Sequence, residues 1–265
     1  GALQSVAIAG GDASRIAVSY SDGGVQLLGF DAERLTEKAM LDAVHLADGR
    51  RATLSGTDVT FFPGTTRSGN LALFIHGGAL PAPVAYGVEV EGDGAVAGLC
   101  SGLPLAEGDG LLRLAYWTSD TPQTLRSGRL VEVADEIIFL PNETVDAARP
   151  ITACLLGDSE ATVLSAPVIA AVNITQPQGA ARLILDSSGN YTATTNDLNA
   201  APLTVTDGIT VRVPQVPVDM AGTGDARDGG YGNGVVLIAG RSENGDVVVF
   251  ADPGTLLSTR NDDAS

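Results

Sequence analysis

The chain has 265 residues, of which 44% are hydrophobic, and a formal net charge of −17 that arises from 32 acidic and 15 basic residues. This length is enough for one large all-β domain or for two smaller domains. The acidic excess argues against nucleic acid as a partner, because binding to phosphates requires Lys and Arg. No apolar run approaches the ~20 residues of a membrane-spanning helix, so we expect no membrane span.

Glycine and proline divide the sequence into short apolar segments, a pattern that is typical of many short strands joined by tight turns. The strands predicted in this way are 3–9, 15–20, 25–30, 35–41, 58–62, 71–75, 84–90, 96–100, 111–117, 125–133, 136–140, 151–156, 168–174, 181–185, 191–195, 209–213, 235–239 and 246–250. Segment 31–44 is also rich in helix formers, so helix and strand are both open there. The glycine-rich segment 214–234 is predicted to be a surface loop.

A short unit recurs along the chain, and its two most similar copies begin at Arg15 (RIAVSYSD) and Arg113 (RLAYWTSD). Looser copies begin at Asn70, Arg182 and Val235. Intervals of roughly 40 to 70 residues are typical of propeller blades. We therefore predict an all-β fold, a β-propeller of five or six four-stranded blades that forms one domain over residues 1–265.

Two other architectures are compatible with the same strands. One is a β-sandwich, and the other is a pair of small β domains divided near Pro150. If the propeller is correct, the strands that contain Arg15, Leu71, Arg113 and Val236 should take equivalent places in their blades.

The repeated unit carries an arginine at its start and an aspartate at its end. Arg15 and Arg113 are therefore candidate substrate-binding residues for a small anionic ligand, with Asp22 and Asp120 at the opposite ends of the same strands. The alternative is that these side chains connect one blade to the next. A protein partner, instead of a small ligand, is also open.

Few other residues suggest chemistry. His45 and His76 are the two histidines, and we expect both on the surface, in a polar connection and a hairpin turn, without a functional role. Cys100 and Cys154 lie in strand-like segments and form one disulfide if the protein is exported, or else two buried thiols.

Acidic residues in the glycine-rich segment suggest a cation site. Asp225 and Asp228 could supply oxygen ligands to calcium, and the alternative is that this segment is simply a flexible loop.

Three segments resemble the β-propeller phytases, which are secreted, calcium-dependent enzymes that hydrolyse phosphate esters of inositol. These segments are TDVTFFP (57–63), AGLC (97–100) and GVVLIAGRSENGDVVVF (234–250). The resemblance implies a periplasmic or extracellular protein and places Asp58 at a calcium-binding position. The chain departs from the family because Thr60 stands where the family has arginine and Lys38 is its one lysine.

These departures favour an exported, non-catalytic binding or interaction module, or an accessory phytase-like domain. Phosphoryl transfer depends on Arg, Lys or metal ions to stabilise charge, and the basic part of that equipment is sparse here. The alternative is an active calcium-dependent phosphoesterase that acts on phytate or related phosphate esters.

Overall fold

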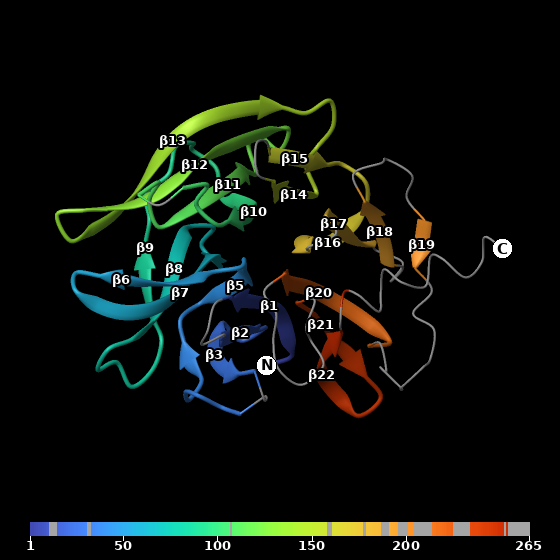
Figure 1. Ribbon diagram of the computed structural model, residues 1–265, viewed down its shortest axis with the longest axis horizontal. Helices are drawn as coiled ribbons and strands as arrows, with labels where there is room; N and C mark the ends of the chain where they lie inside the picture. The colour runs from blue at the N-terminus through green and yellow to red at the C-terminus, as the bar shows by residue number, and fades with distance from the viewer. Residues whose placement is uncertain are drawn as a thin grey trace. The chain divides into compact units, whose positions relative to one another are not determined.

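Strands account for nearly all the secondary structure of the computed structural model (Figure 1). The structure describes residues 1–10, 15–30, 33–106, 108–157, 161–176, 179–186, 191–195, 201–203, 214–224, 234–251 and 253. Contacts divide the chain into two compact units, Gly1–Ser165 and Ala166–Ser265, which are described separately. No helix in the described ranges is long and apolar enough to span a membrane.

The first unit contains four antiparallel sheets. Sheet 1 consists of β1 (Leu3–Ala9), β2 (Arg15–Tyr20), β3 (Gly24–Gly29) and β4 (Ala39–Met40). Sheet 2 consists of β5 (Ala43–Leu46), β6 (Arg50–Leu54), β7 (Thr57–Thr66), β8 (Leu71–Gly77) and β9 (Val84–Gly87). Sheet 3 consists of β10 (Val96–Gly102), β11 (Leu112–Thr118), β12 (Thr124–Val133) and β13 (Glu136–Asp146), and sheet 4 of β14 (Ala153–Leu156) and β15 (Ala161–Leu164).

The second unit contains two antiparallel sheets. Sheet 5 consists of β16 (Val168–Gln176), β17 (Gly179–Asp186), β18 (Tyr191–Thr195) and β19 (Ala201–Leu203). Sheet 6 consists of β20 (Val216–Thr223), β21 (Val235–Ser242) and β22 (Gly245–Ala251). In both units the strands of a sheet follow one another in the chain, which is the topology of propeller blades.

Sheet 2 has five strand segments but the same plan. Both β5 and β6 pair with β7, so that Leu46 lies opposite Gly64 and Arg50 lies opposite Phe61. The two segments are therefore one strand that is interrupted at residues 47–49. With β5 and β6 counted together, sheet 2 is a four-stranded meander like sheets 1 and 3.

Each sheet of the first unit buries side chains against the next sheet. Phe62 of β7 packs with Ala17 and Phe74 between sheets 1 and 2, whereas its neighbour Phe61 packs with Tyr116 between sheets 2 and 3. Both phenylalanines are almost fully buried. Both faces of β7 are covered at this point, so the two apolar residues Phe61 and Phe62 stand next to each other and do not alternate with polar ones.

The same packing continues in the other sheets. Trp117 and Leu125 of sheet 3 contact Cys154 of sheet 4. In the second unit, Val172 of sheet 5 packs with Ile238 of sheet 6.

The all-β prediction is confirmed, and several strands have the predicted bounds, among them β1, β2 and β18. Segment 31–44 contains the short strand β4 and no helix in its described residues. The predicted strand at 209–213 lies outside the described residues. The prediction that residues 1–265 form one domain stays a prediction.

Two expectations were wrong. Residues 214–234 are not all loop, because β20 occupies Val216–Thr223, and Pro217 is accommodated beside an irregularity in the pairing with β21. The Leu71 strand, β8, is third in its sheet, whereas the strands of Arg15, Arg113 and Val236 are second. The second and third strands of a sheet both have apolar sequences, because both of their faces are buried, so the sequence does not show which of the two places a strand takes.

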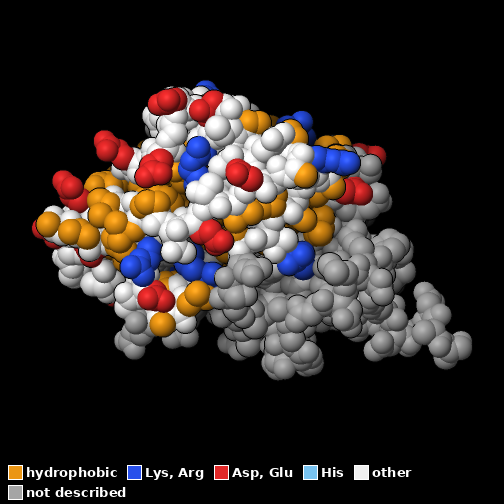
Figure 2. All heavy atoms as spheres, turned by 90° about the horizontal axis from the view of Figure 1, so that it is seen from above, with side chains coloured by type: hydrophobic (Ala, Val, Ile, Leu, Met, Phe, Trp, Pro, Cys, Tyr) orange, Lys and Arg blue, Asp and Glu red, His pale blue; other side chains and the backbone are white. Residues whose placement is uncertain are grey.

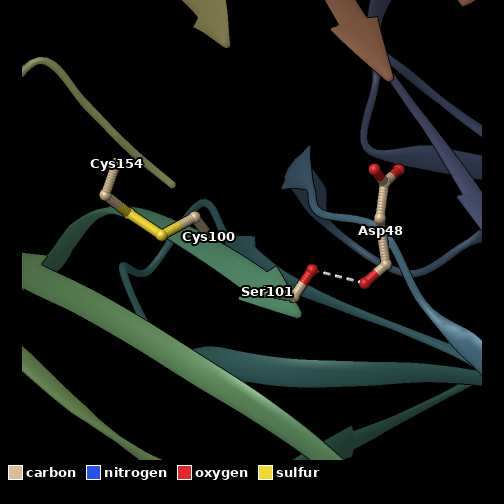
Figure 3. Close-up of a disulfide and its surroundings, with 4 residues drawn as sticks. All are labelled: Asp48, Cys100, Ser101 and Cys154. Atoms are coloured by element: carbon tan, nitrogen blue, oxygen red, sulfur yellow. Dashed lines mark hydrogen bonds between the residues drawn. A yellow bond between two sulfur atoms is a disulfide. The ribbon is translucent and has the colours of Figure 1, made fainter. Parts of the chain in front are cut away.

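Polar contacts and a disulfide connect the first strands of successive sheets (Figure 3). Cys100 of β10 and Cys154 of β14 form a disulfide between sheets 3 and 4. The Ser101 hydroxyl donates to the carbonyl of Asp48, in the interruption between β5 and β6. The Asp48 carboxylate in turn accepts the Ile8 amide of sheet 1 at 2.8 Å.

The disulfide should contribute measurably to stability, because it closes a loop with a sequence separation of 54 residues. We expect the double variant Cys100→Ala/Cys154→Ala to lose ~2–4 kcal/mol of unfolding free energy. Chemical denaturation with and without reductant measures this loss. Equal stability of the variant and the oxidised protein would contradict a constraining role for the bond.

Gly49 is the tightest point of the interrupted strand. A Cβ at this position would lie 1.9 Å from the carbonyl oxygen of Phe61, whereas a Cβ at Gly87 of β9 would meet no atom within 4 Å. We expect Gly49→Ala to destabilise the protein by at least ~1–3 kcal/mol, and Gly87→Ala to have a much smaller effect. Thermal unfolding of the two variants gives the comparison, and equal melting temperatures would show that residues 47–49 are not tightly packed.

Candidate functional site

Arg15 is the first residue of β2 and lies at the edge of the contact between sheets 1 and 2. It shares a face of the strand with Ala17, which packs against sheet 2, because alternate residues of a strand point the same way. Its neighbours across the sheet are Ala9 and Gly29. Both are too small to pack along the length of an arginine side chain.

The opposing face of sheet 2 carries a row of polar residues at the same place. Thr60 of β7 lies opposite His76 of β8 and also opposite Arg51 of β6. Thr60 and His76 share their faces with Phe62 and Phe74, which pack against sheet 1. The apolar contact between the two sheets therefore ends in polar side chains, and we call Arg15, Arg51, Thr60 and His76 the polar cluster.

Within the polar cluster, the charge of Arg15 in sheet 1 affects the pKa of His76 in sheet 2. Burial lowers the pKa of His76 below its usual value, the positive charge of Arg15 lowers this pKa further, and the backbone of Leu80 opposes both effects. His76 is therefore neutral at pH 7. Its Nδ1 atom is buried and has no hydrogen-bond partner.

Arg15 also lacks a partner in the part of the chain that the structure describes, where its guanidinium makes no hydrogen bond or ion pair. The side chain is partly buried. A partly buried charge without a counter-charge is unfavourable, because transfer from water costs free energy that no contact returns. The polar cluster thus combines a cationic group and a buried ring nitrogen, neither of which has a hydrogen-bond partner among the described residues.

Arg113, the second residue of β11, is the counterpart of Arg15 in the repeated unit and lies in sheet 3. Its Nε donates to the carbonyl of Leu103 at 2.8 Å, and its Nη1 donates to the carbonyl of Gly157 at 2.7 Å. These bonds connect β11 with the segments that follow β10 and β14. Arg113 therefore joins sheets 3 and 4. That it binds a ligand stays a prediction.

The aspartates of the repeated unit lie beyond the other ends of these strands. Asp22 binds the Nζ atom of Lys38 at 2.6 Å, and this hydrogen bond is the main reason that the pKa of the carboxyl lies far below its usual value. A hydrogen bond from Thr118 lowers the pKa of Asp120. The structure thus does not bring these aspartates to the arginines of their own strands.

The predicted calcium ligands are not assembled in the described residues. Asp58 is 64% exposed and contacts Arg51 at 3.4 Å and Thr53 at 2.8 Å. Asp225 and Asp228 lie outside the described residues. Within the described ranges no group of three or more His, Cys, Asp or Glu side chains is placed to hold a metal ion.

Acidic side chains are dispersed over the face that Figure 2 shows, with Lys and Arg between them. This distribution fits a surface that keeps the protein soluble through its net charge.

The sequence placed His76 in a hairpin turn on the surface. The residue is partly exposed, but it lies in a strand and not in a turn. Strand β8 continues through His76 to Gly77, so the residue falls on the face that Ala72 and Phe74 direct toward sheet 1. The alternation of 72, 74 and 76 was visible in the sequence. The Gly-Gly pair that follows His76 suggested a turn that begins two residues too early.

No family model matches the chain, and no curated protein matches it. Solved structures do match. A fungal lectin from Aleuria aurantia, described as a six-bladed β-propeller with a novel fucose recognition mode, has a TM-score of 0.57 and 11% identity, covering 93% of this chain and 95% of the lectin. An arginine-to-alanine triple mutant of AofleA from Arthrobotrys oligospora has a TM-score of 0.56 and 14% identity, covering 94% of this chain and 81% of that chain.

These likenesses concern the fold. Together with the sheets of consecutive strands among the described residues, they show that the chain has the β-propeller fold. At such low identity they do not transfer a ligand or an activity.

The pH dependence of stability should report on His76. Because its pKa is lower in the folded state than the usual 6.5, the unfolded chain binds more protons as the pH falls through 6.5. We expect the unfolding free energy to decrease between pH 7.5 and 5.5 and the variant His76→Phe to show a smaller decrease. The difference is about 1.4 kcal/mol for each unit by which the pKa is displaced.

Denaturation curves at several pH values measure this effect, with His45→Phe as the control for loss of the other imidazole. Identical pH profiles for His76→Phe and the unmodified protein would contradict the placement of a neutral His76 beside Arg15.

Proposed function

We propose that the chain is an exported, non-catalytic binding module that holds a small anionic ligand at Arg15, between sheets 1 and 2. The observation that carries this proposal is the partly buried guanidinium of Arg15, which has no partner among the described residues although the chain has 32 acidic residues. A carboxylate, sulfate or phosphate group would supply two oxygens to such a guanidinium, the strongest type of charge-assisted hydrogen bonding.

The fold is compatible with this role. Polar residues at strand ends are held in place by the buried strands behind them, here by Ala17 and Phe74, and a rigid scaffold lowers the entropy lost on binding. The Aleuria aurantia lectin shows that a propeller of this size can serve recognition of a small ligand. A protein partner with an exposed carboxylate is the alternative occupant of the same position.

Export is supported by the disulfide between Cys100 and Cys154. Such bonds persist in oxidising compartments and are rare in reducing ones. We therefore place the protein in the periplasm or outside the cell, where its charge of −17 would also keep it soluble.

The phytase-like alternative would need calcium. In the described residues its predicted ligand Asp58 is bonded to Arg51 and Thr53, so calcium would have to replace these contacts. An assay of phytate and p-nitrophenyl phosphate hydrolysis, with millimolar calcium and with chelator, tests this alternative. Calcium-dependent release of phosphate would contradict the proposed binding module and support the enzyme.

Binding should depend on Arg15. We expect calorimetric titration at pH 7 to detect binding of at least one of D-glucuronate, sulfate and inorganic phosphate, and little binding of the neutral sugar L-fucose. The variant Arg15→Met should bind the same anion about 10- to 100-fold more weakly, the effect of losing a hydrogen bond to a charged group.

Arg149→Met is the matched control, because Arg149 is exposed and the substitution removes the same charge. Its affinity should stay within about twofold of the unmodified protein, since an exposed, distant charge acts only through screened electrostatics. Equal losses in the two variants, or no binding of any anion, would contradict the proposal.

A further inference from the structure

We propose that His76 is a second ligand-binding residue, and that anion binding at Arg15 is coupled to uptake of one proton by its imidazole. The inference rests on the proposed function, since it concerns the same site. It follows from the placement of His76 on the face of sheet 2 that meets Arg15, and from an Nδ1 atom that has no hydrogen-bond partner.

The coupling begins with the charge of Arg15. In the structure the guanidinium disfavours a protonated imidazole. An anion bound to Arg15 cancels this repulsion and adds an attraction of its own, so both effects favour the imidazolium. By linkage, whatever raises the proton affinity of His76 when the anion binds must raise the affinity for the anion when the proton binds.

Hydrogen bonding adds to the effect of charge. The backbone of Leu80 stabilises the protonated ring, as a carbonyl does when a ring N–H donates to it. Because Nδ1 has no hydrogen-bond partner, it is the ring nitrogen at which the proposal places the added proton. A proton taken from solvent makes Nδ1 a donor as well, and an oxygen of the anion becomes its acceptor.

The step involves no other chemistry. One proton moves from solvent to Nδ1, the ring changes from neutral to singly positive, and no bond of the ligand is broken. Nδ1 is shielded from solvent in the structure, so the proposal requires that anion binding open a path to this atom.

Other charged groups near this contact already have partners. Arg51 of β6 and Asp58 of β7 pair with each other at 3.4 Å on the face that carries His76. Asp48, between β5 and β6, accepts the amide of Ile8 at 2.8 Å. Sheet 1 contributes Arg15 with the uncharged Ala9 and Gly29 beside it. Arg15 is therefore the group whose electrostatic effect on His76 is cancelled when an anion binds.

Calorimetry with D-glucuronate and sulfate tests the coupling, because both stay ionised between pH 5.5 and 7.5, unlike phosphate. Titrations at pH 7 in two buffers of different ionisation enthalpy give the number of protons taken up. We expect a value between zero and one, and an affinity that rises as the pH falls, by at most about 10-fold per pH unit for one coupled proton.

Two variants identify the group that takes up the proton. His76→Asn should bind the anion with no proton uptake and with an affinity that does not change with pH. His45→Asn, which removes the other histidine, should behave like the unmodified protein. Proton uptake that persists in His76→Asn and disappears in His45→Asn would overturn the inference.

The outcomes separate this inference from the proposed function. Anion binding that is lost in Arg15→Met but involves no proton uptake in the unmodified protein overturns the role of His76 and leaves the binding module intact. Absence of binding by both anions overturns the binding module itself, and the coupling falls with it.

Discussion

Burial of both faces of a sheet against its neighbours is the constraint on which the rest of the structure depends. In β7 the adjacent residues Phe61 and Phe62 enter different intersheet contacts, and both are almost completely buried. Burying one such side chain is worth ~1.5–3 kcal/mol. A sheet that lost one of its neighbours would expose a whole face, so the sheets within a unit depend on one another.

This constraint decides where polar side chains can lie. Among the described residues, polar side chains that are buried between sheets 1 and 2 make hydrogen bonds across the contact, as Ser5 does to the carbonyl of Leu46 and Ser19 to the carbonyl of Val44. Others lie near strand ends and connect neighbouring sheets there. Asp48 and Arg113 do so through backbone groups of Ile8 and Gly157. Arg15 is the counterpart of Arg113 in the repeated unit, but its guanidinium makes no hydrogen bond among the described residues, and its charge acts on His76. This difference makes it the candidate ligand contact.

The sequence predicted the strands well because their signal is local. Apolar runs between glycines gave β1 and β2 with the bounds that the structure has. The interrupted strand of residues 43–54 was missed, because Asp48 and Gly49 look like a turn. In the structure these two residues instead contact β1 and β10. Such contacts join parts of the chain that are distant in sequence, and no local pattern reveals them.

The candidate site was predictable only in part. Arg15 was identified from the repeated unit, yet the same pattern gave Arg113 equal weight, and the carbonyls of Leu103 and Gly157 that bind Arg113 belong to other segments. His76 was missed because its importance arises from the partner sheet. A repeat shows which positions are equivalent, but it does not show what each position faces.

The most direct test of the account is nuclear magnetic resonance of the side-chain nitrogens during titration with sulfate. The account predicts that the Arg15 guanidinium and the His76 imidazole shift together and saturate at the same concentration, while the Arg113 guanidinium, already bound to two carbonyls, is nearly unchanged. A response centred on Arg113, or shifts spread evenly over exposed arginines, would contradict a binding site between sheets 1 and 2.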